Sequence, residues 1–310
     1  MKKIQYSRYG GPEELRLDEV DTPVPGKGQV LVRVKAASIN PMDWKIRRGE
    51  MKPLSGLKFP RGLGHDFSGV IEAVGQGVGE YQRGDEVLGL TSIPRAGALA
   101  ASVVADAKNV WRKPPGVSFE DAAALILVGV TAWTALVEKA ELQAGQSVFV
   151  NGCLGSVGRS AVQLAISRGA HVVGSCSRNG LGEARALGVR EAVDYESLDP
   201  HSFEHRFDVV FDTVGTLSLT MCDVMLRPDG VSLHIVPNFS KWIGSLFSRR
   251  HHLVFGNPTP SSLNGIAEAA EKGALVAKIG LVVPLSKAIP AIVALETTGT
   301  PKGKLVIVPD

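Results

Sequence analysis

The chain has little cysteine and no long hydrophobic run. Its three cysteines, Cys153, Cys176 and Cys222, form no C-x-x-C pair and no disulfide pattern. This excludes a disulfide-stapled secreted domain and favours a reducing compartment. The longest apolar run, Ala122 to Val130, is about half of a membrane span. We therefore expect a soluble cytoplasmic protein with no stable membrane insertion.

An excess of charge of one sign is also lacking. The 34 basic residues nearly balance the 31 acidic ones, and the net charge of +3 is too small to indicate a nucleic-acid partner. The basic start, Met1 to Lys3, leads into no apolar signal-peptide core. With 310 residues, of which 44% are hydrophobic, the chain can form two domains with sizeable cores.

What is present is a strand–turn–helix–strand pattern between residues 147 and 177. An apolar run, 147–151, leads into a glycine-rich turn, 152–158. A helical segment, 159–168, follows, and then a second apolar run, 171–177. This order predicts a βαβ unit that seats a dinucleotide pyrophosphate on a helix N-terminus, where backbone N–H groups lack partners.

The glycine pattern departs from the G-x-G-x-x-G fingerprint at its first position. Cys153 stands there, while Gly155 and Gly158 keep the other two places. An ordinary strand-to-helix turn is the alternative, but the flanking strands and helix favour the dinucleotide site. The residues that we assign to the pyrophosphate are Gly152, Gly155, Ser156, Val157 and Gly158.

The end of the second strand indicates which dinucleotide binds. Sites for NAD usually place an acid there to bind the ribose 2′-hydroxyl, but this chain has Ser177-Arg178-Asn179. A hydroxyl and a guanidinium would hold a 2′-phosphate, which a carboxylate would repel. We therefore predict NADP(H) over NAD(H). The alternative is that Arg178 merely solvates a loop.

Motifs along nearly the whole chain, in order, resemble the medium-chain dehydrogenase/reductase superfamily. Within it, they are most similar to the zinc-independent quinone oxidoreductase branch, which includes zeta-crystallin. The motifs are Asn40-Pro41-x-Asp43, Gly64-His65-Asp66-x-x-Gly69-Val70, Gly84-Asp85-x-Val87, Asn151-Gly152-x-x-Gly155-x-Val157-Gly158, Asp194-Tyr195 and Gly303-Lys304-Leu305-Val306.

The resemblance implies an α/β protein with two domains. A GroES-like, β-rich catalytic domain would span residues 1–122 and be completed by residues 262–310. A Rossmann domain, a doubly wound parallel sheet that binds NADP, would span residues 123–261. The resemblance also implies a homodimer, formed through edge pairing of residues 251–256.

Further site residues follow from the resemblance and from strand ends. Asn40 and Thr131 would hydrogen-bond a carboxamide or a quinone oxygen, although Thr131 could equally cap or pack a helix. Lys45 stands where many relatives have tyrosine, so Lys45, His65 or solvent would donate the proton. Val214 and Gly215 follow a predicted parallel strand, at the edge where ligands bind. The remaining cofactor contacts that the resemblance implies are Tyr195, residues 235–237 with Val236, Phe255, Gly256 and Lys304.

The ligands of a catalytic zinc are incomplete. Asn40 falls where the first cysteine ligand of zinc alcohol dehydrogenases would lie, and residues 91–106 have no cysteine for a structural zinc. His65 remains, and one histidine cannot hold zinc, so we predict no metal. A hydrogen-bonded role for His65 near a turn is the simpler interpretation.

These observations predict an NADPH-dependent, zinc-independent oxidoreductase that transfers hydride to a small apolar quinone. One alternative is an enone, alkenal or enoyl-thioester reductase on the same scaffold. A second is a non-catalytic NADPH-binding structural or regulatory protein, and a third is a zinc alcohol dehydrogenase. The aromatic and basic segment 239–252 is open between a packed surface segment, a lid and a membrane contact.

Overall fold

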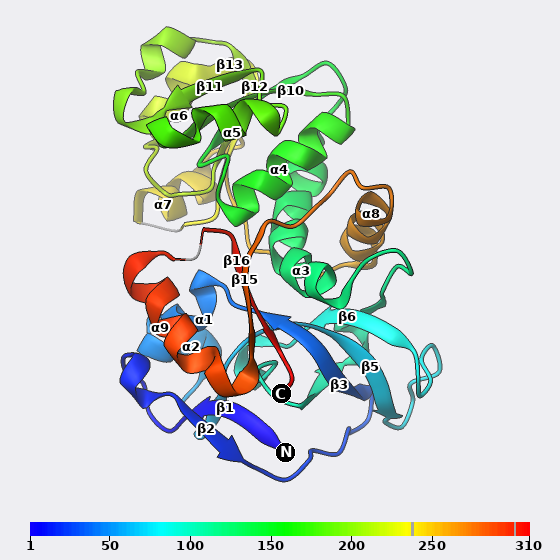
Figure 1. Ribbon diagram of the computed structural model, residues 1–310. Coiled ribbons are helices and arrows are strands. Elements are labelled where there is room, and N and C mark those ends of the chain that lie inside the picture. Colours follow the sequence, from blue (N-terminus) through cyan, green and yellow to red (C-terminus); the bar gives the residue numbers. More distant parts are fainter. Residues whose placement is uncertain (237–238, 301) are drawn as a thin grey trace. The chain divides into compact units, whose positions relative to one another are not determined.

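The computed structural model describes residues 1–236, 239–300 and 302–310. The chain divides into two compact units (Figure 1). Unit 1 comprises Met1–Leu127 and Val276–Asp310, and unit 2 comprises Val128–Leu275. This confirms the predicted α/β fold class, with one β-rich unit and one unit built on a parallel sheet.

Unit 1 is built on short, mostly antiparallel strands. Its main sheet has the order β15-β16-β3-β5-β6-β8, with β7 pairing β3, and a smaller sheet has the order β2-β1-β4. The strands are β1 (Lys2–Tyr6), β2 (Arg16–Glu19), β3 (Gln29–Ser38), β4 (Arg61–Gly62), β5 (Asp66–Val74), β6 (Glu86–Leu90), β7 (Ser102–Asp106), β8 (Val110–Arg112), β15 (Ile279–Pro284) and β16 (Lys304–Val308).

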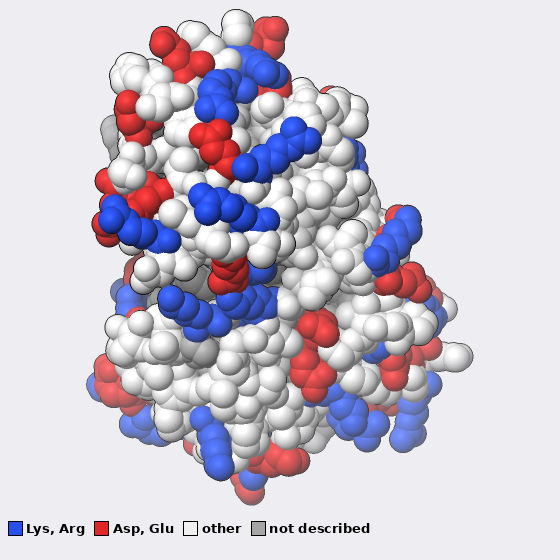
Figure 2. All heavy atoms as spheres, turned by 45° about the horizontal axis from the view of Figure 1, so that its top comes forward, with Lys and Arg blue, Asp and Glu red and all other residues white. Residues whose placement is uncertain are grey.

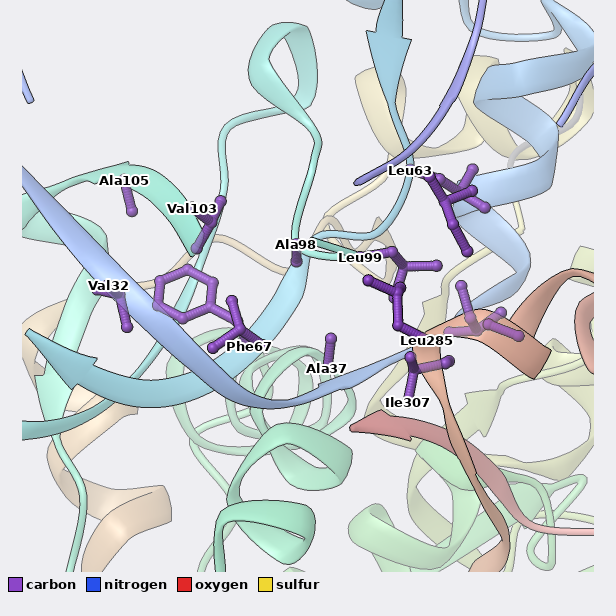
Figure 3. Close-up of a cluster of buried hydrophobic side chains, with 14 of the residues drawn as sticks. Val32, Ala37, Leu63, Phe67, Ala98, Leu99, Val103, Ala105, Leu285 and Ile307 are labelled. Atoms are coloured by element: carbon purple, nitrogen blue, oxygen red, sulfur yellow. The ribbon is translucent and has the colours of Figure 1, made fainter. Parts of the chain in front are cut away.

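The C-terminal segment completes the core of unit 1. Leu285 and Ile307 pack into the same hydrophobic cluster as Val32, Phe67 and Leu99, which come from the N-terminal part of the chain (Figure 3). Strand β16 pairs with β3 through Val306 and Ile307. The return of the tail to the β-rich unit, expected from the resemblance, is therefore present.

Helix α1 (Pro41–Arg48) begins directly after β3 and carries several predicted site residues. Its start is set by Pro41 at the first helical position and by the Asp43 carboxylate, which accepts the Asn40 N–H at 2.7 Å. Gly49 ends it in the left-handed conformation, with φ of 84°. Unit 1 also contains α2 (Lys52–Ser55), α9 (Ala288–Thr298) and the first part of α3 (Phe119–Trp133).

Unit 2 contains a parallel sheet in the order β11-β10-β9-β12-β13-β14. The strands are β9 (Ser147–Asn151), β10 (His171–Cys176), β11 (Glu191–Asp194), β12 (Phe207–Asp212), β13 (Leu226–His234) and β14 (His251–Leu253). The order reverses between β9 and β12, and this switch point is where open α/β sheets bind ligands. The predicted strand 251–256 ends early because its partner, β13, ends at His234 opposite Leu253.

Helices connect the strands of this sheet. They are α4 (Ser156–Ser167), α5 (Leu181–Ala186), α6 (Leu219–Met225) and α7 (Phe239–Phe247), and α8 (Pro260–Glu271) follows the last strand, β14. Within segment 239–252, residues 239–247 form helix α7, which buries Lys241 and leaves Trp242 half-exposed. Helix α8 begins at Thr259, whose hydroxyl accepts the Ser262 N–H at 3.1 Å.

The chain passes between the units later than the boundaries at residues 122 and 261 that the sequence suggested. Helix α3 (Phe119–Trp133) runs through the first boundary without a break. Helix α8 belongs to unit 2 because it packs on the end of α3. A Cβ at Gly129 would lie 3.2 Å from Ile266, and one at Gly265 would overlap the Trp133 ring.

Within the described residues, the helix Phe119–Lys139, formed by α3 and its π-helical extension η4 (Thr134–Lys139), is long and apolar enough to span a membrane. In this structure 72% of the most apolar 18-residue stretch of this helix is buried by protein, as in the core helix of a globular domain.

Figure 2 shows basic and acidic side chains interspersed over the face it draws, in keeping with the small net charge.

Candidate functional site

The glycine turn of unit 2 has the shape that a pyrophosphate requires. Gly152 adopts a φ of +78°, and a Cβ there would lie 2.4 Å from Val214 Cγ2. A Cβ at Gly158 would lie 2.1 Å from the Gly152 carbonyl oxygen. Gly152 therefore makes the tight turn that the fingerprint assigns to the position of Cys153. Gly155 is the N-cap residue of α4, and no side chain caps it.

Ser156 and Val157 form the first turn of α4, so their backbone N–H groups lie at the positive end of the helix dipole. Anions bind at such ends because these N–H groups lack intrahelical acceptors. The turn thus fits a dinucleotide pyrophosphate.

The ends of β10 and β11 lie side by side, since Cys176 is opposite Asp194 in the parallel ladder. Ser177 follows β10 and is exposed. Arg178 donates through Nε to Asp194 Oδ2 at 3.0 Å, while its side chain stays 78% exposed. Tyr195 follows β11 and is 54% exposed. The three residues predicted for the adenosine phosphate are therefore brought to one edge of the sheet.

Beyond the switch point, the loop after β12 is organised by a buried carboxylate. Asp212 accepts the N–H groups of Val214 at 3.2 Å and Gly215 at 2.8 Å, and the Asn151 side chain at 2.8 Å. Burial would raise the pKa of Asp212, but the hydrogen-bond donors and His234 outweigh it and hold the pKa below its usual range. The carboxylate is thus ionised and fixes the Val214–Gly215 turn beside Gly152.

Other predicted cofactor residues lie close together in pairs. A Cβ at Gly215 would lie 2.8 Å from Val236 Cβ, and one at Gly256 would lie 2.5 Å from Thr131 Oγ1. Val214 and Phe255 expose about half of their surface, so both side chains are accessible to a ligand. Pro237, expected beside them, lies outside the described residues.

In unit 1, Asn40 is held in a buried polar cluster. Its Nδ2 donates to Asp66 Oδ2 at 2.8 Å, and its Oδ1 accepts from Lys304 Nζ at 2.6 Å. Ser38 Oγ also donates to Asp66 Oδ2, at 2.7 Å. Both ends of the Asn40 amide are therefore engaged within unit 1, and the same cluster holds the ammonium of Lys304. Lys45, on α1, is half-buried.

His65 lies next to this cluster and is buried. Its Nδ1 is 2.6 Å from Asp43 Oδ1, so the carboxylate orients the imidazole ring. The hydrogen-bonded role that we considered simpler for His65 is the one observed. Among the described residues, none hydrogen-bonds its Nε2.

Known protein families match residues in both units. The alcohol dehydrogenase GroES-like domain family matches residues 26–115, and the zinc-binding dehydrogenase family matches residues 187–307. The quinone oxidoreductase from Coxiella burnetii has a structure that superposes with a TM-score of 0.90 and 30% identity, covering 100% of this chain and 99% of that one.

The chain belongs to the medium-chain dehydrogenase/reductase superfamily. It is 36% identical over 220 residues to the chloroplastic quinone-oxidoreductase homolog of Spinacia oleracea, over 69% of this chain and 67% of that one. It is 34% identical over 236 residues to the chloroplastic NADPH-dependent alkenal/one oxidoreductase of Arabidopsis thaliana, over 73% and 59% of the two chains. The protein is thus an oxidoreductase of this superfamily.

One matched family is described as zinc-binding, but a lysine lies among the polar residues of unit 1 where zinc would be expected. Lys304 Nζ lies 2.6 Å from Asn40 Oδ1 and 3.5 Å from Asp66 Oδ2, and a positive charge there opposes a second cation. Within the residues described, no group of three or more His, Cys, Asp or Glu side chains could hold a metal ion. The residues do not fit the zinc centre of zinc-dependent superfamily members.

Three polar residues that support the predicted site were not among the site residues predicted from the sequence. Asn151, Ser175 and Asp212 support the strand ends, and Ser175 Oγ donates to Asn151 Oδ1 at 2.6 Å. The sequence carries a signal for them, since each is a polar residue at or near the carboxyl end of a strand whose centre is apolar. A buried polar residue in such a place needs partners, and these three supply them to each other.

Proposed function

We propose that this protein is an NADPH-dependent, zinc-independent reductase that transfers hydride to a quinone. The observation that carries the proposal is the pair Ser177 and Arg178 at the end of β10, next to a glycine turn that fits a pyrophosphate. Arg178 binds Asp194 through Nε, and the paired terminal nitrogens of a guanidinium suit a bidentate phosphate contact.

Each part of the site has a defined task in this proposal. The first turn of α4 holds the pyrophosphate, and the turn after β12 holds Val214 and Gly215 at the same sheet edge. The exposed apolar side chains of Val214 and Phe255 offer a water-poor surface for a flat ring. Bound NADPH would supply the hydride from its nicotinamide.

A quinone accepts hydride readily, so a metal is not needed in this proposal to polarise its oxygen. The reduced quinone gains one proton besides the hydride. His65, which Asp43 orients, or Lys45 could deliver it, as could solvent.

An alkenal or enone is the second candidate acceptor, and the name of the Arabidopsis thaliana relative supports it. The test is a panel of quinones and alkenals assayed with NADPH and NADH side by side. We expect faster oxidation of NADPH, with quinones preferred over alkenals. Tight NADPH binding without oxidation by any acceptor would instead favour a structural or regulatory role.

The cofactor assignment is tested by Arg178→Asp. We expect this variant to raise the KM for NADPH at least tenfold and to leave the KM for NADH nearly unchanged, because a carboxylate repels a 2′-phosphate. The control is Arg227→Asp, which breaks the Arg227–Asp208 ion pair at the opposite end of the strands. An unchanged NADPH preference in Arg178→Asp would disprove the assignment.

We also propose that the protein forms a homodimer and needs no metal for activity. Light scattering after gel filtration measures the first, and activity after treatment with a chelator measures the second. A monomer, or activity lost on chelation and restored by Zn²⁺, would contradict these two proposals.

A further inference from the structure

Unit 2 buries a lysine that the proposed reaction does not use. Lys241, on α7, is 2% exposed. Its Nζ donates to Asp212 Oδ2 at 2.7 Å and to the Gly215 carbonyl oxygen at 3.2 Å. Lysine is rarely buried this completely, because removing the ammonium from water is costly unless a partner compensates. Here the partner is the carboxylate that shapes the turn after β12.

The contacts of Asp212 extend from Lys241 to the glycine turn. Asn151 Nδ2 donates to Asp212 Oδ1 at 2.8 Å, and Asn151 Oδ1 accepts from Ser175 Oγ at 2.6 Å. Ser175 Oγ in turn accepts the Gly152 N–H at 3.1 Å. This polar chain crosses the carboxyl ends of β12, β9 and β10. It connects the helix that carries Lys241 with the turn that fits the pyrophosphate.

Helix α7 packs closely against its neighbour α6, and this packing fixes the position of Lys241 beside Asp212. A Cβ at Gly244 would lie 2.4 Å from Leu219 Cδ1, so the helix approaches the start of α6 at that point. The next residue after Lys241, Trp242, is half-exposed, which shows that α7 turns its lysine inward and an aromatic ring outward. An apolar side chain in the place of Lys241 would fill the volume without the cost of a buried charge.

We propose that Lys241 is a positioning residue of the dinucleotide site. It neutralises Asp212, and Asp212 holds the Val214–Gly215 turn against Gly152, where the nicotinamide half of the cofactor is expected. Lys241 does not touch the cofactor in this proposal and acts through Asp212. The inference rests on the proposed function, because it assigns a residue to the same cofactor site.

The titratable groups around Asp212 make the effect of removing the Lys241 ammonium depend on pH. His234 Nδ1 lies 3.6 Å from Asp212 Oδ2, and its Nε2 is 2.8 Å from Ser232 Oγ. Ser232 Oγ also contacts His251 Nδ1 at 2.7 Å, and His251 lies 3.5 Å from Asp223. The other charged group near Asp223 is Arg250, at 3.3 Å. If the ammonium of Lys241 is removed, a protonated His234 can take its place beside Asp212.

The experiment measures the dissociation constant of NADPH by nicotinamide fluorescence at pH 6, 7 and 8. For Lys241→Met we expect a rise of about tenfold at pH 8, the loss of one charge-assisted contact, and recovery towards the wild-type value at pH 6. Lys241→Arg keeps the charge and should stay within about threefold of wild type. The matched control is Lys272→Met, which removes an exposed lysine paired with Glu268 in the same unit.

A second variant keeps the test decisive if Lys241→Met does not fold. The double variant Lys241→Met/Asp212→Asn removes both charges, so it should fold and bind NADPH about tenfold more weakly at every pH, without recovery at pH 6. Wild-type affinity in either variant at all three pH values would overturn the inference. If the wild-type protein itself binds neither NADPH nor NADH, the proposed function fails, which is a different result.

Discussion

Lys304 and Asp66 are a buried pair in unit 1, and Lys241 and Asp212 are a buried pair in unit 2, but the two carboxylates differ in the direction of their pKa shifts. In unit 1, Asp66 Oδ2 accepts hydrogen bonds from Ser38, Asn40 and Lys304, while no described residue donates a hydrogen bond to Oδ1. Burial raises the pKa of Asp66, although Lys304 lowers it in part. In unit 2, both oxygens of Asp212 are engaged, and its pKa is held below the usual range.

The difference comes from the groups around each carboxylate. Burial raises the pKa of Asp212, but His234, Lys241 and Asn151 outweigh it, whereas burial prevails at Asp66. Asp212 stands at the carboxyl end of a parallel strand, where the following turn presents the N–H groups of Val214, Gly215 and Leu217. Asp66 stands at the start of an antiparallel strand, where its partners are side chains. These backbone donors add to the side-chain donors of Asp212 and lose no side-chain freedom, so the buried charge is better compensated in unit 2.

The largest expected effect comes from removing each carboxylate in turn. Asp212→Ala strands the ammonium of Lys241 and several N–H groups, so we expect the free energy of unfolding to fall by about 3–5 kcal/mol. Asp66→Ala should cost less, about 2 kcal/mol, because burial already lowers the pKa of Lys304 and eases its neutralisation. Urea unfolding measures both, and equal losses would remove the distinction between the pairs.

A smaller effect is expected at acid pH, where Asp212 and Asp66 change the free energy of unfolding in opposite directions. The lowered pKa of Asp212 contributes stability above the unfolded value, about 3.9, and that stability is lost as the pH falls. The raised pKa of Asp66 works the other way, since its contribution is present at low pH and lost as the pH rises.

Asp212→Asn should therefore shrink the drop in unfolding free energy between pH 6 and pH 3, whereas Asp66→Asn should enlarge it. Urea unfolding of wild type and both variants at several pH values checks the two signs. A change of the same sign in both variants would contradict the comparison.

The smallest effect is expected for Lys304→Met. Lys304 is buried and donates to Asn40 Oδ1 and to the Ile39 carbonyl oxygen, at 2.6 and 3.1 Å. We expect a loss of about 1–2 kcal/mol in stability, with the dissociation constant of NADPH within about twofold of wild type. The cofactor contact that the resemblance implied for Lys304 predicts instead a clear loss of NADPH affinity, so fluorescence titration separates the two roles.

Much of unit 2 could be predicted because its signals are local. The apolar run 147–151, the glycines after it and the helix that follows are adjacent in sequence, and they formed β9, the turn and α4 as expected. The position of the tight turn, at Gly152 instead of Cys153, needed coordinates because only the φ angle reveals it. The contacts between α8 and α3 leave no local signal in the sequence.

The sequence by itself determined the order of the elements, the residues at the strand ends and the incomplete set of zinc ligands. These features depend on side-chain type and spacing over short stretches of sequence. They can be predicted because strands and helices each have a characteristic periodicity of apolar residues. Only the tertiary structure decided that Lys241 meets Asp212 and that Lys304 meets Asn40 and Asp66. Such pairs join residues far apart in the chain, and burial gives them their strength, so the fold has to exist before the interaction does.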